Sequence, residues 1–572
     1  MAYQKYSKIQ LAVIAVLILF MIIQEVISIT QNSLTSDENL YIGAGKEIFE
    51  TGNLRTVVVM AHPPLSYYIG SIFLIPLKFE KRIWQNHDWK RGQDLIFHSG
   101  YDPNKIIFFS RLPFVFLSVF LALYVLKWAT ELYGVKSGII ALFLYSFNPS
   151  IIAYSGIVIT DFTVAAMMFI AIYYFWKLFK EPSRKNLILS GIFLGFALLS
   201  KITAILLIFI FTILGIICIY HGKYKISIKK LIKNLLIMLF ISFLLIFSFY
   251  GFQFGTLSNS LPSEFYVDKA RQELSKAGFF SKQLIYIYDN VPLPIPSYIG
   301  EIGYLFYISS QPNPGYIFGR VTNNVVWYYV YVTFLLKTGI TLLIFLAMLF
   351  VFRKRLPQKD LLTNLSLWLP ILLVFANFSL TNKISGVRHI LLVYPFMFIL
   401  VSNLVNVKLN KQKKYIFIIS VLLFYYALSA ILIAPHYMAY ISEIFLGPNN
   451  AHKIIVGSSI DHGQDLYRLK KYMDKNNIKK IKLSYFGQAD PKDYNISYEY
   501  LPSPNFFVWV PDYKIPPLNE RKEDCSEKKE LIAISITNLK NVYLTNKTCF
   551  DWLKKSEPID KAGYSIFIYD IK

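Results

Sequence analysis

The chain has 572 residues, of which 55% are hydrophobic and only 16% are charged, and its mean hydropathy is +0.44. Soluble proteins carry a larger charged share, so this composition excludes an ordinary soluble enzyme. The net charge of +24 would suit a nucleic-acid-binding protein, but the distribution of the basic residues along the chain argues against that class.

Apolar runs of about 20 residues recur along the chain and predict membrane-spanning helices. The first run, 9–29, has no small-residue cleavage site, so we expect a true span and not a removable signal. In chain order the expected spans cover 9–29, 106–126, 137–153, 162–179, 187–200, 202–220, 232–251, 326–352, 362–380, 386–405 and 414–434. The sequence therefore predicts a polytopic α-helical membrane protein with about eleven transmembrane helices.

The basic residues are concentrated on one side of this expected topology. If the N-terminus is cytoplasmic, the short cytoplasmic segments hold 21 basic residues against three acids, Glu131, Glu181 and Asp360. The two long loops on the other side, 30–104 and 252–325, hold near-equal numbers of both signs. An excess of Lys and Arg marks cytoplasmic loops. We therefore expect a multi-pass protein of the cell (plasma) membrane with an extracytoplasmic C-terminal region, and no nucleic acid as partner.

The chain divides into a transmembrane domain, 1–434, and a small soluble domain, 435–572, here called the C-terminal domain. In the first long loop, Leu40–Glu50 predicts an amphipathic helix lying in the membrane interface. The second long loop, 252–325, is too long for a simple connector, and long loops often carry function. In the C-terminal domain, a strand–helix–strand pattern and three later strand candidates predict an α/β fold: Lys453–Ser458, Gly463–Asn476, Lys479–Phe486, Phe506–Val510, Leu531–Ile536 and Tyr564–Tyr569.

Two of the three cysteines, Cys525 and Cys549, fall in the C-terminal domain, which we expect in a compartment where a disulfide persists. The sequence does not fix their distance, so a bridge and two free thiols are equal alternatives. Cys218 lies inside an apolar span, where packing explains it.

Three acidic residues and one histidine are candidates for the site. Asp37 and Glu38 follow the first span directly, so they emerge at the membrane surface. A carboxylate there can remove a proton from an acceptor hydroxyl, although a solvated loop or an N-cap would explain the pair too. His62 opens a His-Pro-Pro-Leu run 25 residues after Asp37, where a rigid turn is the alternative. Asp161, at the outer mouth of the third and fourth spans, is either a partner of a cation or an N-cap.

Three cations, Arg111, Lys201 and Arg388, are expected near the outer ends of spans. Each alone is explained by snorkelling of its long side chain to the headgroups. Together, on the face that carries the acids, they suit a lipid phosphate, because Arg presents a fork of donors and Lys a point charge. In the C-terminal domain, residues 461–465 (Asp-His-Gly-Gln-Asp) open the expected helix, and a strand-to-helix turn with a capping Asp is favoured over a metal site.

Several of these motifs resemble those of the protein O-mannosyltransferases and the related lipid A aminoarabinose transferases, which are multi-span GT-C glycosyltransferases. The resemblance covers most of the chain and is looser between residues 252 and 380. The extra β-trefoil domain of eukaryotic O-mannosyltransferases has no counterpart here, which weakens any transfer of their protein acceptor. The resemblance is carried by Asp37-Glu38, His62-Pro63-Pro64-Leu65, Arg111-Leu112-Pro113, the glycine-rich 191–200 before Lys201, Gly386-Val387-Arg388-His389 with Tyr394-Pro395, and the tail 436–565, which is similar to that of one bacterial branch.

The resemblance implies an inverting transfer of a sugar from a polyprenyl (dolichyl or undecaprenyl) monophosphate to an acceptor hydroxyl of a protein, glycan or lipid at the outer membrane face. Metal dependence varies among such enzymes, so a divalent cation stays open. The alternative is a transporter or flippase for an amphipathic lipid, which would not need two large outer loops and a folded outer domain. By similarity, Asp37 is the general base, Glu38 and Asp161 support the acceptor or a cation, Arg111, Lys201 and Arg388 grip the donor phosphate, and His62 and His389 are further candidates.

Overall fold

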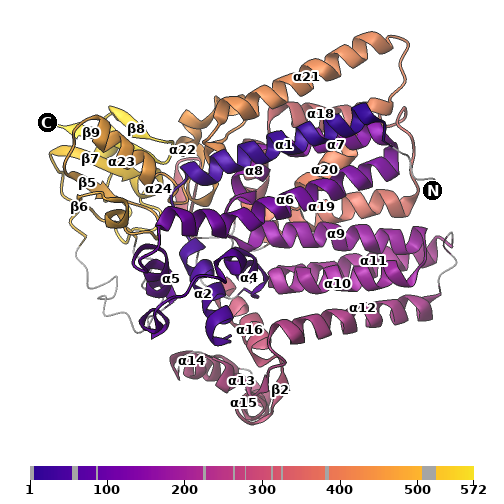
Figure 1. The fold of residues 1–572 in the computed structure, drawn as a ribbon, viewed down its shortest axis with the longest axis horizontal. Coiled ribbons are helices and arrows are strands. Elements are labelled where there is room, and N and C mark those ends of the chain that lie inside the picture. Colours follow the sequence, from indigo (N-terminus) through magenta and orange to yellow (C-terminus); the bar gives the residue numbers. More distant parts are fainter. Residues whose placement is uncertain are drawn as a thin grey trace.

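The structure is a computed structural model that describes residues 6–54, 62–85, 88–222, 224, 227–261, 264–276, 278–310, 313–323, 326–380, 386–504 and 523–572. A bundle of long helices forms most of the molecule, and a small sheet lies at one end of it (Figure 1). The two chain ends lie at opposite ends of the bundle. The strand candidate Phe506–Val510 lies outside the described residues.

The described part of the chain contains seven helices that are long and apolar enough to cross a membrane, or up to nine candidates if two bent pairs count as one span each. The prediction of a polytopic helical membrane protein is thereby confirmed. Two shorter helices, α10 (Arg184–Ser200) and α20 (Val393–Ser402), occupy two more of the predicted positions. The seven are α1 (Lys8–Gln31), α6 (Pro103–Tyr133), α9 (Thr160–Lys180), η3 with α11 (Ile202–Tyr220), α12 (Ile228–Phe249), α19 (Leu361–Leu380) and α21 (Gln412–Ile433).

Two segments that the sequence predicts as single spans are broken. The predicted span 137–153 consists of α7 (Val135–Ser146) and α8 (Pro149–Ser155), which meet at 63°. Proline at the first position of α8 cannot continue the preceding helix, and the Asn148 side chain caps the new one. The predicted span 326–352 consists of α17 (Tyr329–Lys337) and α18 (Ile340–Val351), which meet at 109° around Gly339. A straight-helix interpretation of both segments is therefore wrong.

The helices differ in how deeply they lie in the bundle. In the most apolar window of α9, 94% of the residues are buried, whereas in α12 and α21 only 22% are. Helix α9 is thus the central element, and its first turn carries Asp161. Helices α12 and α21 expose large apolar side chains such as Phe240 and Phe424, as helices facing lipid do.

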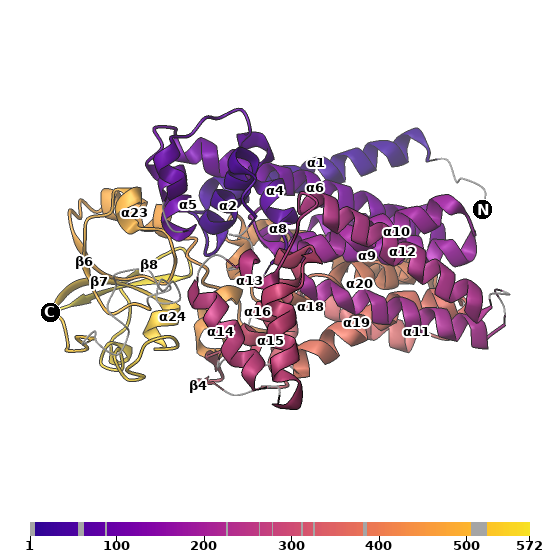
Figure 2. The same cartoon turned by 90° about the horizontal axis from the view of Figure 1, so that it is seen from below.

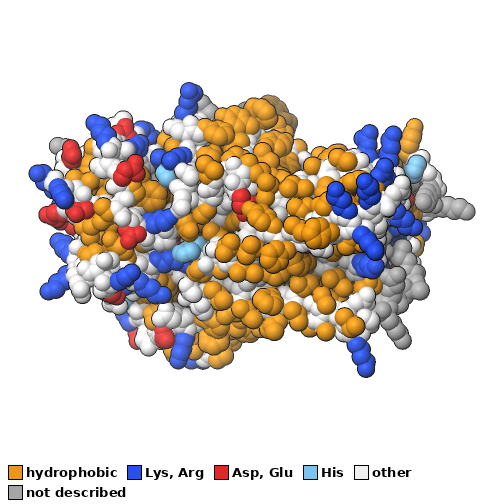
Figure 3. Space-filling model, turned by 90° about the horizontal axis from the view of Figure 1, so that it is seen from above, with side chains coloured by type: hydrophobic (Ala, Val, Ile, Leu, Met, Phe, Trp, Pro, Cys, Tyr) orange, Lys and Arg blue, Asp and Glu red, His pale blue; other side chains and the backbone are white. Residues whose placement is uncertain are grey.

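The surface charges follow the bundle axis. Figure 3 shows hydrophobic side chains over the middle of the visible face of the molecule. The end that carries the sheet has side chains of both signs, whereas Lys and Arg dominate the charged side chains of the opposite end. This is the asymmetry that the sequence predicts for the two sides of a membrane.

Both long loops fold at the sheet end of the bundle, and Figure 2 shows the helices of the second loop grouped there. The helix expected at Leu40–Glu50 is present as α2 (Glu38–Thr51), but it is buried instead of lying in the interface. It packs so closely on α5 (Asp88–Phe97) that a Cβ on Gly43 would lie 2.8 Å from Gly92 Cα. The other loop elements are α4 (Leu65–Ser71), η1 (Ile72–Leu74), η2 (Lys81–Gln85), α13 (Leu257–Ser260), α14 (Glu264–Ser275), η4 (Gly278–Phe280), α15 (Ser281–Asn290), α16 (Pro296–Ser310) and the hairpins β1 (Phe254–Gly255) with β2 (Leu293–Pro294) and β3 (Gly315–Ile317) with β4 (Arg320–Thr322).

The C-terminal domain contains a five-stranded mixed sheet in the order β6-β5-β7-β9-β8. Strands β5 (Ile481–Ser484), β7 (Glu530–Ser535) and β9 (Ile566–Ile571) and helix α23 (Leu466–Lys475) confirm four predicted elements. The strand expected at Lys453–Ser458 is wrong, because this segment forms short helical turns. Strands β6 (Tyr498–Tyr500) and β8 (Asp560–Ala562) were not expected. The short helices from residue 387 onward are η5 (Val387–Ile390), η6 (Asn403–Asn406), η7 (Tyr437–Ala439), η8 (Glu443–Phe445), η9 (Pro448–Asn450), α22 (Ala451–Ile454), η10 (Gly457–Ser459), η11 (Pro491–Tyr494), α24 (Ile536–Leu539) and η14 (Leu553–Lys555).

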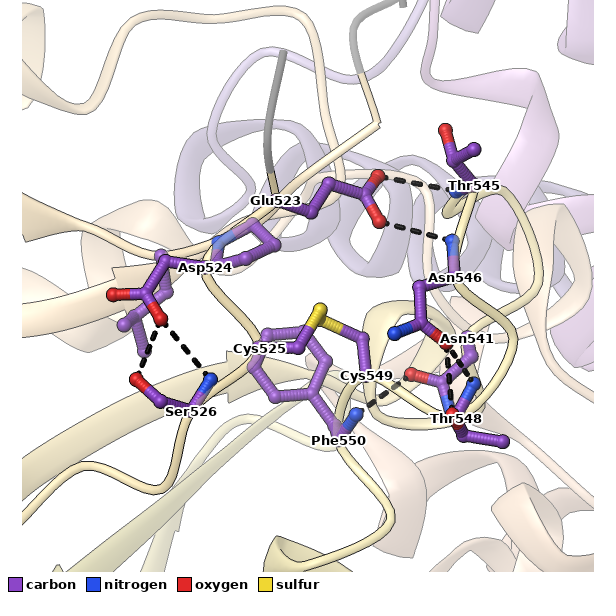
Figure 4. The surroundings of a disulfide bond; sticks show 12 residues. Glu523, Asp524, Cys525, Ser526, Asn541, Thr545, Asn546, Thr548, Cys549 and Phe550 are labelled. Carbon is purple, nitrogen blue, oxygen red and sulfur yellow. Dashed lines mark hydrogen bonds between the residues drawn. A yellow bond between two sulfur atoms is a disulfide. The ribbon is translucent and has the colours of Figure 1, made fainter. Parts of the chain in front are cut away.

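Cys525 and Cys549 form a disulfide, which decides between the two alternatives left open by the sequence. Figure 4 shows the bond beside Glu523, whose carboxylate accepts hydrogen bonds from the N–H groups of Thr545 and Asn546. The bridge and these bonds tie the segment before β7 to the loop 545–549. Cys218 is buried and free, as expected.

Candidate active site

Asp37 begins α2 and presents its carboxylate away from that helix. Its backbone is left-handed, with φ of 76°, and its side chain makes no capping hydrogen bond. The N-cap alternative therefore does not describe what this side chain does. The carboxylate instead lies 3.5 Å from Nη1 of Arg388 and accepts a hydrogen bond of 3.3 Å from Nε2 of Gln488. It keeps 28% of its surface exposed, so a ligand can reach it.

Arg388 lies between two carboxylates. Its Nη1 faces Asp37, and its Nε lies 3.8 Å from Oδ2 of Asp161. Both distances exceed those of ordinary charge-assisted hydrogen bonds. Among the described residues, the Nε–H of Arg388 has no hydrogen-bond partner although the atom is buried. The guanidinium thus keeps donor capacity for an incoming anion.

Asp161 contacts two further side chains of the site, Lys201 and His389. Its Oδ1 lies 2.5 Å from Nζ of Lys201 and 3.1 Å from Nδ1 of His389. Asp161 stands in the first turn of α9, whose N-cap is Ile159, so the capping alternative fails here too. Lys201 follows the last residue of α10, and His389 belongs to η5. The ends of three helical segments therefore bring these side chains together.

Glu38 and Arg111 form a separate, fully buried pair. Arg111 donates from Nε and Nη2 to the Glu38 carboxylate over 2.9 and 2.6 Å. Its remaining N–H groups bond the carbonyl oxygens of Ile29, Asn32 and Ser33 over 2.8 to 2.9 Å. All five donors of this guanidinium are thus engaged inside the protein. Arg111 was expected to contact the donor phosphate, but in this arrangement it has no free N–H to donate. It instead holds Glu38 against the backbone of residues 29–33.

The ionisation of Glu38 follows from this pairing. Burial raises its pKa, but the charge and hydrogen bonds of Arg111 and the N–H groups of Val158 and Thr35 outweigh burial and hold the pKa below its ordinary value. A charged carboxylate without exposed surface, with both oxygens bonded to protein, cannot accept a proton from a substrate. Glu38 therefore fixes the start of α2 next to Asp37.

His62 lies just before α4. Its carbonyl oxygen accepts a hydrogen bond of 2.9 Å from the Tyr67 hydroxyl. The Tyr67 ring stacks on Tyr41, one turn after Asp37, at 4.9 Å between ring centroids. The segment is thus joined to the start of α2 through two aromatic rings, consistent with the turn alternative for the Pro-Pro run.

Two cavities meet at Arg388. The first, about 190 Å³, is lined by Asp37, Arg388, His462, Gln488 and eleven further residues. The second, about 40 Å³, is lined by Asp161, Lys201, Arg388 and His389 at one end. Its other walls are mainly apolar side chains of α9, α11 and α19, including Met168, Leu206 and Phe378. Arg111, Glu38 and His62 line neither cavity.

The C-terminal domain supplies two site residues that the sequence did not single out as catalytic. Gln488 bonds both the carboxylate and the backbone N–H of Asp37. His462 lies 3.1 Å from Nη1 of Arg388. Burial, together with the neighbouring Arg388 charge, lowers the pKa of His462, so the ring is neutral and its Nε2 accepts from the guanidinium. The position of His462 in the 461–465 motif was a usable signal, whereas nothing in the sequence marks Gln488.

The rest of that motif has structural partners. Asp461 accepts from the Thr537 hydroxyl over 2.6 Å, and Asp465 accepts from Ser565 over 2.7 Å. Among the described residues, the one group of three possible metal ligands is Glu523, Cys525 and Cys549. The two sulfur atoms of that group are bonded to each other. The sequence left open whether the protein binds a divalent cation, and we assign no residues of the described part of the chain to such an ion.

The chain resembles known proteins in sequence and in fold. Residues 104–250 match the family model of dolichyl-phosphate-mannose-protein mannosyltransferase. No curated protein sequence matches the chain significantly. Similar solved structures include ArnT from Cupriavidus metallidurans in the apo state (10% identity, 98% of this chain and 97% of that chain, TM-score 0.49) and bound to undecaprenyl phosphate (10%, 98% and 97%, 0.48). The apo oligosaccharyltransferase of Archaeoglobus fulgidus is similar too (15%, 83% and 59%, 0.44).

The TM-scores lie below 0.5, so the assignment depends on the family match and on the site. The matched segment contains two of the motifs on which the resemblance was based, Arg111-Leu112-Pro113 and the glycine-rich 191–200 before Lys201, and it also contains Asp161. The family match over residues 104–250 supports the resemblance to GT-C glycosyltransferases that the motifs indicated.

Proposed function

We propose that this protein transfers a sugar, with inversion, from a polyprenyl (dolichyl or undecaprenyl) monophosphate to an acceptor hydroxyl. The observation that supports the proposal best is the position of Arg388, which lines both cavities and faces Asp37 in one and Asp161 in the other. The matched family is described by a dolichyl-phosphate mannose donor, which is the same chemical class. The charge asymmetry of the surface supports an extracytoplasmic site.

On the donor side, Lys201 and Arg388 hold the phosphate, and His389 lies beside them on Asp161. Lys201 brings a point charge and Arg388 an unpartnered Nε–H. A phosphate oxygen would accept this Nε–H and so satisfy a buried donor that the described residues leave open. The apolar side chains that line the smaller cavity offer contacts to the hydrocarbon next to the phosphate. Asp161 holds Lys201 and His389 in place and is a positioning residue.

On the acceptor side, Asp37 is the general base. Its carboxylate takes the proton of the acceptor hydroxyl while that oxygen forms a bond to the anomeric carbon of the sugar. The bond between this carbon and the phosphate oxygen breaks, and its electron pair stays on the leaving polyprenyl phosphate.

The reaction moves negative charge across Arg388. Asp37 loses one negative charge when it takes the proton, and the leaving phosphate gains one. Because the guanidinium lies between the two groups, it stays close to a compensating charge throughout, and it stabilises the charge that develops in the transition state. Arg111 and Glu38 act indirectly by holding the start of α2.

The test is Asp37→Asn in purified protein in lipid nanodiscs, with a radiolabelled undecaprenyl-phosphate sugar as donor. A general base contributes about 10²- to 10⁴-fold, so we expect sugar transfer to fall by at least about 10²-fold. Binding of undecaprenyl phosphate should persist, since Lys201 and Arg388 remain. Asp268→Asn is the matched control, because Asp268 is exposed on α14 in the second loop.

Retained transfer in the Asp37→Asn variant would count against the base assignment. The anomeric configuration of the product, measured by NMR, tests inversion separately. In proteoliposomes, movement of the intact lipid across the bilayer without cleavage of the sugar would instead support the flippase alternative.

A further inference from the structure

We propose that the larger cavity is the acceptor subsite, that the C-terminal domain builds it, and that it takes an uncharged saccharide. This inference rests on the proposed function, because it assigns the acceptor of the same reaction. Eight of the fifteen lining residues belong to the C-terminal domain: Val456, Gly457, Ser458, His462, Phe486, Gln488, Val542 and Tyr543. The opposite wall holds Asp37 and Arg388, so a ligand in this cavity contacts the proposed base directly.

The lining chemistry matches a sugar ring. Four aromatic side chains border the cavity, namely Tyr316, Tyr329, Phe486 and Tyr543. Aromatic rings cover the C–H faces of a pyranose, and phenol groups add polar tips. Amides and hydroxyls suited to the hydroxyl edges come from Asn313, Gln488, Ser36 and Ser458. The cavity of about 190 Å³ is smaller than the roughly 300–1,000 Å³ of drug-sized ligand sites, so it leaves room for a small ligand such as a single sugar ring.

The charges of the cavity argue against an anionic acceptor. Its ionisable acid and base are Asp37 and Arg388, and Arg388 already faces Asp37 and Asp161. His462 accepts a hydrogen bond from Arg388 and is neutral. The remaining lining residues carry no ordinarily charged group. A phosphorylated lipid or an acidic peptide would thus find no second cation in this cavity.

The backbone around the cavity argues against an extended peptide. Peptides are often bound by pairing along an exposed strand. Here β3 pairs with β4 on one side and bridges Ile455 on the other. The Gly457 N–H donates to Thr537, and the Ser458 carbonyl accepts from Tyr154. Several main-chain groups of the strand and of the segment that border the cavity are therefore already engaged within the protein and are not open to a peptide.

The experiment compares acceptors in the nanodisc assay. Methyl pyranosides of mannose, glucose and galactose are offered beside uncharged hexapeptides that contain Ser or Thr. Transfer to at least one pyranoside, and none to the peptides, is expected. Saturation-transfer NMR on the wild-type protein measures pyranoside binding without any donor, so this part stays informative even if the donor sugar is poorly matched.

The variant Tyr543→Ala locates the subsite. We expect it to raise the acceptor KM by about tenfold, the effect of losing one good aromatic contact, with an unchanged donor KM. Tyr543→Phe keeps the ring and should stay within about threefold of wild type. Tyr500→Ala is the matched control, because Tyr500 is exposed on β6 of the same domain.

Three results would overturn the inference. They are transfer to the peptides but not to pyranosides, pyranoside transfer that a folded Tyr543→Ala variant leaves unchanged, and absence of any saturation transfer to the pyranosides. Absence of donor cleavage in the wild type would contradict the proposed function instead, and the saturation-transfer measurement would still decide the acceptor class.

Discussion

Replacing Arg111 by Met separates the two roles that this residue can have. In the structure, the change removes two hydrogen bonds to Glu38 and three to main-chain carbonyls. Breaking a buried ion pair by removing one partner costs about 3–5 kcal/mol, because the other charge stays buried and uncompensated. Each carbonyl left without a donor adds about 1 kcal/mol. A loss of this size approaches the whole stability of many proteins.

The assay is thermal unfolding of the purified protein in detergent, with undecaprenyl phosphate binding measured at a temperature where the variant is still folded. We expect a large drop in melting temperature for Arg111→Met and an unchanged affinity for the lipid phosphate. The double variant Glu38→Gln/Arg111→Met should melt above Arg111→Met, because it leaves no buried charge. Arg111→Lys should fall between wild type and Arg111→Met, since Lys cannot reproduce the planar fork.

The pH dependence gives a second readout. The pKa of Glu38 is lowered in the folded protein, so its contribution is fully present above the ordinary value of 4.5 and is lost as the pH falls toward the lower folded value. In Arg111→Met only burial and neutral hydrogen-bond donors act on Glu38. Protonation of Glu38 in acid therefore removes the uncompensated buried charge that destabilises the variant. The difference in melting temperature between wild type and variant should therefore narrow between pH 7 and pH 4.

Two results would refute this reasoning. One is a variant that melts like wild type but binds undecaprenyl phosphate poorly, which would restore Arg111 to the phosphate site. The other is a melting difference that does not change with pH.

Two further predictions concern stability. Gly92→Ala should lower the melting temperature by the equivalent of about 1–3 kcal/mol, because the new Cβ would lie 2.0 Å from the Asn39 carbonyl oxygen beside the start of α2. Gly303→Ala, where a Cβ meets open space, serves as its control, and equal melting of the two variants would contradict the packing argument. Cys549→Ser should destabilise the C-terminal domain by about 3 kcal/mol, since the disulfide joins residues 24 positions apart. Dithiothreitol should bring the wild type to the same melting temperature, and a bridge without effect on unfolding would show that the segment is held by other contacts.

The sequence predicted the architecture well because hydrophobic length and charge asymmetry are local signals. A helical segment lies at each of the eleven expected positions. The prediction of a straight helix was wrong for two spans, which bend near Pro149 and Gly339. Both segments are apolar on either side of the bend. Hydropathy does not respond to such a bend, although proline at the first gives a local reason for it.

Local sequence patterns do not distinguish the two residues of the acidic pair, and only the family resemblance gave Asp37 and Glu38 different expected roles. Asp37 has a left-handed backbone, and Glu38 begins the helix. Their side chains therefore diverge, one toward Arg388 and the other toward Arg111. Arg111 comes 73 residues after its partner, so no spacing rule links them. For the same reason Gln488, 451 residues after Asp37, carries no signal in the chain.

The C-terminal domain forms part of the wall of the proposed active site and is more than an attached module. Three backbone N–H groups just before Asp37 donate to it: the Ser33 N–H to the Gln464 carbonyl over 3.0 Å, the Leu34 N–H to the Tyr494 hydroxyl over 2.9 Å, and the Ser36 N–H to the His462 carbonyl over 2.9 Å. These bonds fix the backbone on which the proposed base stands. The position of the proposed base therefore depends on Arg111 on the membrane side and on the C-terminal domain on the other side. If one of the two supports were lost, the other alone would leave the Asp37 carboxylate poorly placed before Arg388.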